Sequence, residues 1–211
     1  MEKLLYATYN NNKVAEVQDI LDEFDTDIEL VSLNDFDNVP EFVENETTFL
    51  DNAKDKAHKY AQFSGMPTLA ESSGLCVDHL NGAPGVFSYR YAGQAHNDAR
   101  NNAKLLAAMG GVASAKRNAQ LYTALVISWP DSDDDLISAG TIKGEIMTYP
   151  HGEQNYGYDP LFMVPELGKT LGEMSIAEKN SVSHRGQAFT KMVQELPMWW
   201  NRHVSAMSIE R

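Results

Sequence analysis

Cysteine is almost absent from the 211-residue sequence, which contains only Cys76. One cysteine cannot form an intrachain disulfide, and it cannot build a zinc site from several thiolates. Disulfide-stabilised secreted folds are therefore excluded, and a reducing cytoplasm is the expected compartment. The chain does not need such cross-links, because 43% of its residues are hydrophobic and can form a large core.

Long apolar runs are also absent. The amino-terminal segment MEKLLYATYNNNK offers only a short apolar stretch before polar residues, which is too short for a signal-peptide core or a membrane span. No repeat or low-complexity linker divides the chain. We therefore expect one domain over residues 1–211 and no contact with a membrane.

Basic side chains are scarce, since 17 lysines and arginines face 30 acidic residues and give a formal net charge of −13. This charge repels polyanions, so nucleic acid is not an expected partner. A small phosphorylated substrate remains compatible, because a helix start, a few basic groups and a divalent cation can create a local positive site. Solubility alone also explains the excess of acid.

The first motif is a short apolar strand, residues 4–8, followed by a polar turn and an amphipathic helix. Apolar residues recur after the turn at helical spacing, namely at Val14, Val17, Leu21 and Phe24. Asn11 or Asn12 is the expected N-cap. A helix start can bind phosphate through backbone N–H groups, and Lys13 would add a positive charge. An ordinary capped turn is the commoner alternative.

A second helix is predicted from Thr48 to Phe63, with Thr48 as its cap and Gly65 as its stop. The acidic loop before it, residues 41–46, is more often a solvated surface than a metal site. Two strands, 68–70 and 75–78, are predicted next, joined by a polar elbow at residues 71–74. Ligands of open α/β sheets bind outside strand ends, so this elbow and the turn after residue 8 either form one site or are unrelated turns.

The second half of the chain is predicted to open with a hairpin of strands 121–129 and 136–148. The loop 155–160 then carries Tyr156 and Tyr158 on either side of a glycine, which favours either a platform for a base or a simple turn. Ser175 and Glu178 form a capping box for a short helix. A last helix follows, with an apolar face of Phe189, Met192, Val193 and Leu196.

The order of these motifs resembles the Ham1-like, or inosine triphosphate pyrophosphatase, family from one end of the chain to the other. The matching stretches are residues 7–13 (ATYNNNK), 48–53 (TFLDNA), 73–78 (SGLCVD), 82–88 (GAPGVFS), 90–93 (RYAG), 156–162 (YGYDPLF) and 178–188 (EKNSVSHRGQA). The resemblance implies an elongated α/β fold in which two lobes share one central mixed β-sheet flanked by helices. It also implies a homodimer.

The same resemblance implies a Mg²⁺-dependent enzyme that hydrolyses ITP, dITP and XTP to the monophosphate and pyrophosphate, and so cleanses the nucleotide pool. The triphosphate would be bound by Thr8, Tyr9, Asn10, Asn11, Asn12 and Lys13, and the metal by Glu44 together with Glu71 and position 72. The base and sugar would be bound by Tyr156, Gly157, Tyr158, Asp159, Lys179, His184 and Arg185, and Ser73 would also touch the substrate.

The sequence departs from the family pattern at the position of a catalytic acid. Ser72 stands where the family has an acid that binds magnesium and orients or deprotonates the attacking water. A serine hydroxyl is no general base near neutral pH and a poor magnesium ligand beside a carboxylate. Tyr9 replaces a glycine and is expected to crowd the triphosphate turn; His151 and Tyr156 are further departures.

Three interpretations follow from Ser72. The chain is an active pyrophosphatase whose metal is held by Glu71, Glu44 and Asp78, or a nucleotide-binding protein with little turnover, or a protein that keeps only the fold. The basic and acidic residues of the motifs argue against the last. Apolar and aromatic residues at 84–91 and the Trp199–Trp200 pair are expected to be exposed and to form the dimer contact.

Overall fold

The structure is a computed structural model that describes residues 2–24, 27–93, 97–153 and 156–209. Its centre is a seven-stranded sheet in the order β2-β1-β3-β4-β5-β6-β7. The strands are β1 (Glu2–Tyr6), β2 (Ile28–Ser32), β3 (Thr68–Val77), β4 (Asn118–Ser128), β5 (Leu136–Ile146), β6 (Phe162–Val164) and β7 (Lys169–Thr170). β1 pairs in parallel with β2 and β3, whereas β6 pairs antiparallel with β5 and β7. The expected mixed sheet flanked by helices is confirmed.

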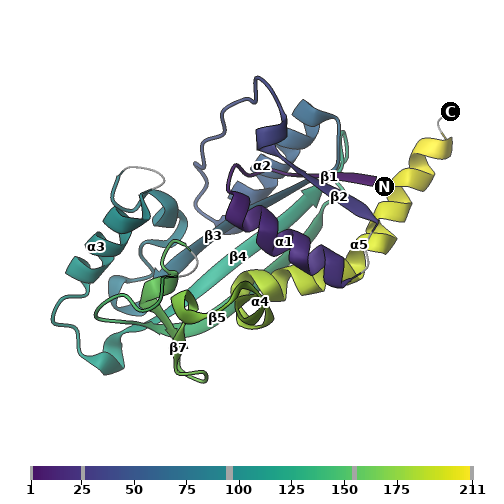
Figure 1. Cartoon of the computed structure of the whole chain (residues 1–211). Coiled ribbons are helices and arrows are strands. Elements are labelled where there is room, and N and C mark those ends of the chain that lie inside the picture. The colour runs from purple at the N-terminus through teal and green to yellow at the C-terminus, as the bar shows by residue number, and fades with distance from the viewer. Residues whose placement is uncertain (1, 25–26, 94–96, 154–155, 210–211) are drawn as a thin grey trace. The chain divides into compact units, whose positions relative to one another are not determined.

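Five α-helices accompany the sheet (Figure 1). They are α1 (Asn11–Glu23), α2 (Phe49–Ser64), α3 (Asp98–Ala108), α4 (Ile176–Val182) and α5 (His184–Ile209). Within the described residues, none of the helices has the length and apolar character needed to cross a membrane.

The chain divides into two compact units, each with its own apolar core. The first comprises residues 1–72, 124–139 and 187–211, and the second comprises residues 73–123 and 140–186. Whether the whole chain behaves as the single expected domain stays a prediction.

The core of the first unit lies between its strands and two helices. Leu4, Tyr6 and Leu69 of the sheet contact the apolar face of α1 and the predicted apolar face of α5. Figure 1 shows α1 and α5 on one face of these strands and α2 on the other. The second unit has a separate core in which α3 packs on the ends of β3, β4 and β5.

Two predicted helix starts are confirmed by their caps, and one is displaced. Thr48 accepts a hydrogen bond from the backbone N–H of Asp51, and Ser175 with Glu178 forms a complete capping box. The N-cap of α1 is Asn10 rather than Asn11 or Asn12. Asparagine is equally suited to all three positions, so the sequence alone could not choose between them.

Two other expectations are wrong, and two elements were missed. Residues 71–74 do not form an elbow, because β3 runs without interruption from Thr68 to Val77. Polar residues and a glycine are typical of loops, but in this protein residues 71–74 are part of a β-strand. β2 and α3 were not predicted at all. The tryptophans are not exposed either: Trp199 and Trp200 are 1% and 6% accessible and pack against Trp129.

Candidate functional site

The turn after β1 is held together by its own side chains. The Asn10 carboxamide oxygen accepts the backbone N–H groups of Asn12 and Lys13 at 2.9 and 3.4 Å, and the Thr8 hydroxyl accepts that of Asn10 at 3.1 Å. The Asn34 carboxamide also stabilises the turn, because it donates a hydrogen bond to the Tyr9 carbonyl. The helix start is thus ordered, and a phosphate that uses these N–H groups must displace the Asn10 cap.

Tyr9 lies at the surface of this turn, and its expected crowding of a bound triphosphate stays a prediction. Its side chain is 53% exposed, and its backbone does not adopt a positive φ. The glycine of the family pattern is therefore not needed here for backbone conformation.

Glu71 of β3 is a buried acid that contacts Tyr6 and Lys13 in the first unit. Its side chain is almost completely buried, and the Tyr6 hydroxyl donates to its Oε2 atom at 2.5 Å. Its other oxygen, Oε1, lies 3.5 Å from the Nζ atom of Lys13 at the start of α1. The structure thus brings Glu71 and Lys13 together, as two predicted site residues from different motifs.

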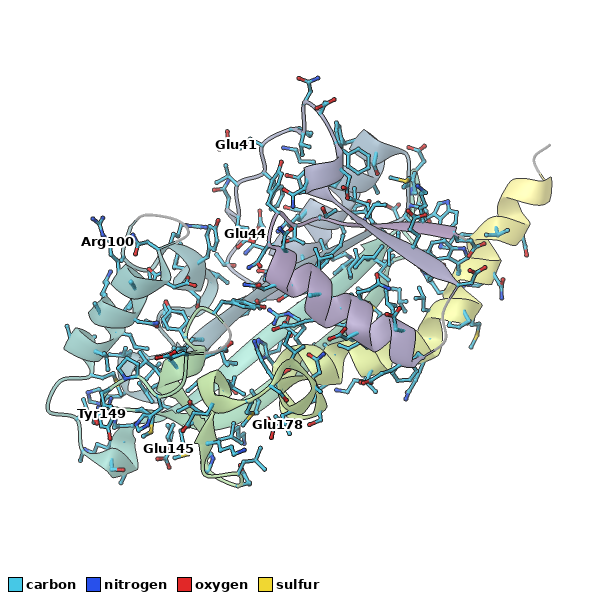
Figure 2. The ribbon with its side chains drawn as sticks, in the orientation of Figure 1. Glu41, Glu44, Arg100, Glu145, Tyr149 and Glu178 are labelled. Atoms are coloured by element: carbon cyan, nitrogen blue, oxygen red, sulfur yellow. The ribbon has the colours of Figure 1, made fainter. Side chains whose placement is uncertain are left out.

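Lys56 of α2 lies near Glu71 and Lys13, although the sequence analysis assigned no role to it. Burial lowers the pKa of Lys56, while Glu44 and Glu71 raise it and Lys13 lowers it further. These interactions place two carboxylates and two ammonium groups near one another within the unit. Figure 2 shows Glu44 on the loop beside the amino-terminal end of α1, in agreement with this grouping.

A signal for Lys56 was present in the helical spacing. Lys56 lies three residues after Ala53 and seven after Phe49, so it borders the buried face of α2 instead of pointing away from it. Lysines at the border of an apolar face usually extend along it into solvent. Lys56 differs from Lys54, which pairs with Asp135, because its neighbouring carboxylates are Glu44 and Glu71.

The loop that carries Glu44 is fixed to α2 by Asn52. The Asn52 carboxamide accepts from the backbone N–H of Glu46 at 3.0 Å and donates to the carbonyls of Glu46 and Thr48. The Tyr60 hydroxyl donates to the Pro40 carbonyl at 3.0 Å. A loop that the sequence presented as a solvated acidic run is therefore anchored at both ends, with Glu44 between the anchors.

Ser72 lies beside Glu71 but does not share its environment. Successive side chains of a strand point to opposite faces, so the Ser72 hydroxyl and the Glu71 carboxylate are directed apart. Ser72 is 3% exposed, and no hydrogen bond to its hydroxyl occurs among the described residues. Position 72 is thus a buried strand position, not part of a solvent-facing turn.

The predicted base-binding residues come together within the second unit. Lys179 is 1% exposed and forms an ion pair with Asp159, with 2.7 Å between Nζ and Oδ2. Its Nζ atom also lies 4.4 Å from the centre of the Tyr156 ring, and the Arg185 guanidinium lies 5.7 Å from that centre. His184 is buried in the same unit.

The tyrosine loop is tied to α3 and to the segment before it. The Gly157 N–H donates to Asp98 at 2.8 Å, and the Asn102 carboxamide donates to the Gly157 carbonyl at 2.9 Å. The Tyr158 hydroxyl donates to the Ser88 carbonyl, and burial raises the pKa of Tyr158. Asn155, which precedes this loop in the predicted motif, lies outside the described residues.

The donor set of the first unit fits a magnesium ion that is bound mainly through its substrate. No group of three or more His, Cys, Asp or Glu residues suited to a metal occurs in the described part of the chain. Mg²⁺ usually takes one or two carboxylates together with phosphate oxygens and water, and Glu44 with Glu71 meets that need. Asp78, the third carboxylate that the sequence suggested, directly follows β3 and is exposed, and its part in metal binding stays a prediction.

Lysines and carboxylates around a helix start, on a mixed sheet flanked by helices, are typical of α/β proteins that bind phosphorylated ligands. Sequence comparison is more specific. The chain belongs to the Ham1 family, whose model it matches over residues 4–195.

Relatives and solved structures agree with this assignment. A dITP/XTP pyrophosphatase of Lactobacillus johnsonii is 56% identical, over 96% of this chain and 98% of that protein. One from Vibrio cholerae is 43% identical, over 93% and 97%. The structure of a HAM1 protein from Coxiella burnetii superposes with a TM-score of 0.84 at 38% identity, covering 94% of this chain and all of that one.

Proposed function

We propose that the chain is a nucleoside triphosphate pyrophosphatase that hydrolyses ITP, dITP and XTP to the monophosphate and pyrophosphate, and so clears deaminated purine nucleotides from the nucleotide pool. Family membership and similarity to relatives such as the dITP/XTP pyrophosphatase of L. johnsonii support the class of reaction. The observation that carries the proposal is the group formed by Lys13, Glu44, Lys56 and Glu71.

This group suits a triphosphate in charge and in chemistry. Lys13 and Lys56 bind phosphate oxygens, and Glu44 and Glu71 would hold Mg²⁺. The cation would neutralise phosphate charge and lower the pKa of a bound water. The transferred phosphoryl group has a loose transition state, so catalysis needs positioned positive charge more than a covalent nucleophile. The half-buried side chain of Lys56 supplies that charge close to Glu44 and Glu71.

The second unit supplies a base subsite. Tyr156 offers its ring for stacking, and Lys179, His184 and Arg185 are hydrogen-bond donors. The 6-oxo group of hypoxanthine or xanthine accepts a hydrogen bond, whereas the amino group of adenine donates one. A donor facing a donor leaves buried polar groups unpaired, at a cost of roughly 1–3 kcal/mol each, so ITP and XTP are preferred over ATP.

A nucleotide-binding protein with weak turnover is the second candidate function. The observation that favours it is Ser72, whose hydroxyl lies on a buried strand and is directed away from the face of Glu71. Glu71 cannot simply take over the place of the missing acid without a change in the backbone. We propose that binding is retained and that the chemical step is slower than an acid at position 72 would allow.

Pyrophosphate release from ITP, dITP, XTP and ATP, each with and without Mg²⁺, tests both candidates. Release from the first three substrates that requires Mg²⁺ supports the pyrophosphatase. Tight binding of ITP by calorimetry with negligible release supports the weakened protein. Binding and hydrolysis of ATP as efficient as those of ITP would contradict the proposed base subsite.

We further propose that the chain acts as a homodimer in the cytoplasm.

A further inference from the structure

Tyr6 is a buried phenol inside an apolar core, and its hydroxyl donates a hydrogen bond to Glu71. Its side chain is fully buried, and its ring packs edge-on against Phe189 with 6.4 Å between the ring centres. The hydroxyl donates to Glu71 Oε2 at 2.5 Å. An apolar residue would fill this core position without the need to satisfy a hydroxyl, so the phenol requires another reason.

The register of the sheet explains how the two side chains meet. Tyr6 of β1 pairs with Leu69 of β3, and Glu71 lies two residues further along β3. Side chains two residues apart on a strand share a face, so Glu71 and Leu69 point to the side on which Tyr6 lies. The contact is thus built into two neighbouring parallel strands and does not depend on a loop.

The hydrogen bond fixes which carboxylate oxygen faces the phosphate turn. Oε2 is engaged by Tyr6, and Oε1 is the oxygen that lies 3.5 Å from Lys13 Nζ. Because the Tyr6 ring is held by the core, its hydroxyl acts as a rigid donor that prevents rotation of the carboxylate. Since position 72 is a serine, Glu71 is the carboxylate that this part of β3 presents, and its orientation matters accordingly.

We infer that Tyr6 is a positioning residue, which holds the Glu71 carboxylate with Oε1 towards the phosphate turn and thereby strengthens divalent-cation binding there. This inference rests on the proposed function, because it assigns Tyr6 a part in that site. It concerns a residue of the first β-strand that touches neither substrate nor metal and acts through Glu71.

The test is Tyr6→Phe, which removes one oxygen atom and leaves the ring. Mn²⁺ binding is measured with the metal alone, from the electron paramagnetic resonance signal of the free ion. Loss of a hydrogen bond to a charged group predicts affinity weakened about tenfold. Turnover of ITP should fall with it. Thr68→Val is the matched control, because it removes a buried hydroxyl from β3, the strand that carries Glu71. The Thr68 hydroxyl donates to the Met66 carbonyl and not to Glu71.

A double-mutant cycle with Glu71→Gln separates positioning from general destabilisation. If Tyr6 acts through Glu71, Tyr6→Phe has no further effect on Mn²⁺ affinity once residue 71 is glutamine. An equal effect in both backgrounds overturns the inference, as does unchanged affinity in the single variant. Tyr6→Met is the substitute if Tyr6→Phe does not fold, which circular dichroism would show.

The Mn²⁺ measurement keeps this inference separate from the proposed function. Absence of ITP turnover in the unaltered chain would reject the pyrophosphatase, yet weaker Mn²⁺ binding by Tyr6→Phe alone would still support the positioning role. Turnover of ITP by the unaltered chain, combined with wild-type Mn²⁺ binding by Tyr6→Phe, would reject the positioning role and leave the pyrophosphatase intact.

Discussion

At the scale of single residues, the chemistry depends on which side chain occupies position 72 and on what surrounds it. Ser72 lies in the middle of a buried strand, so an acid introduced there enters a desolvated position. A buried carboxylate is costly unless a cation or hydrogen-bond donors accompany it. Position 72 is neither part of an elbow nor exposed, so an acid there is not accommodated as freely as in a solvent-facing turn.

Ser72→Asp is expected to raise the turnover of ITP and dITP at least tenfold in the presence of Mg²⁺, because general-base assistance is typically worth about 10²–10⁴-fold. The same change should lower the stability of the metal-free protein, because the new carboxylate occupies a buried strand position. Pyrophosphate release and thermal unfolding with and without Mg²⁺ measure the two effects. Fast turnover by the unaltered chain, with Ser72→Asp neutral or harmful, would show that another residue activates water.

Lys56→Met should weaken ITP binding about 10- to 100-fold, because it removes a positive charge from a site with little water while keeping the aliphatic chain. Lys54→Met is the matched control, since Lys54 lies on the same helix, is partly exposed and pairs with Asp135. Calorimetry with ITP compares the two variants. Equal losses in both would mean that net charge, and not the position of Lys56, governs binding.

At the scale of elements, α3 controls the loop that carries Tyr156. Asp98 and Asn102 lie one helical turn apart, and they bind the N–H and the carbonyl of Gly157. Both backbone groups of one residue are thereby held by one helix. A loop tied in this way keeps a ring in place for stacking without ordering it anew at each binding event.

Asn102→Leu should raise KM for ITP and XTP several-fold with a smaller change in kcat, because the loop that positions the base loses one of its two hydrogen bonds to α3. Arg100→Ala is the control: it lies on the same helix, is exposed, and Figure 2 shows it on the outer side of α3. Steady-state kinetics with both nucleotides decide. A fall in kcat alone would assign Asn102 to folding or to another step.

The caps of the short helices predict a dependence on pH. Hydrogen bonds from the backbone and hydroxyl of Ser175 hold the pKa of Glu178 below its usual 4.5. A carboxyl pKa that is lowered in the folded state adds stability above about pH 4.5, and this stability is lost as the pH falls through the lowered value. Glu178→Gln should therefore lower the urea midpoint at pH 7, and the difference should shrink at pH 3.

Glu166→Gln controls for the loss of one negative charge in that experiment, since no capping hydrogen bond to Glu166 occurs among the described residues. A difference between Glu178→Gln and the unaltered chain that stays constant from pH 7 to pH 3 would mean that the carboxylate does not stabilise the helix start.

At the scale of the whole molecule, exposed aromatic side chains bear on whether the chain forms a homodimer. The burial of Trp199 and Trp200 removes one of the two reasons for expecting a dimer. The other reason remains, because Phe87 and Tyr89 are 57% and 45% exposed in the short helical segment of residues 85–90. Large aromatic side chains on a surface are typical of protein contacts.

Light scattering at micromolar concentration is expected to give twice the monomer mass of 23.5 kDa. Phe87→Ser with Tyr89→Ser should shift the protein towards the monomer, because the apolar area that would be covered is lost. Met198→Ser is the control, as another large exposed apolar residue away from this segment. A monomer mass for the unaltered chain would contradict the homodimer.

The sequence alone determined the class of fold, both ends of α2 and the start of α4. Strand and helix periodicity, the caps at Thr48 and Ser175 and the stop at Gly65 are local signals that act within a few residues, and the structure confirms them. The order of motifs likewise determined the family. These features depend on short-range backbone chemistry or on residue identity, both of which are written directly in the sequence.

Only the tertiary structure decided which residues of distant segments are buried and which of them contact one another. It made residues 71–74 part of a strand, buried Trp199 and Trp200, and brought Lys56 to Glu44 and Glu71. It also placed the Tyr6 hydroxyl on Glu71 across 65 positions of chain. Burial and electrostatic contact depend on which strands become neighbours, and a residue's own sequence surroundings do not contain that information.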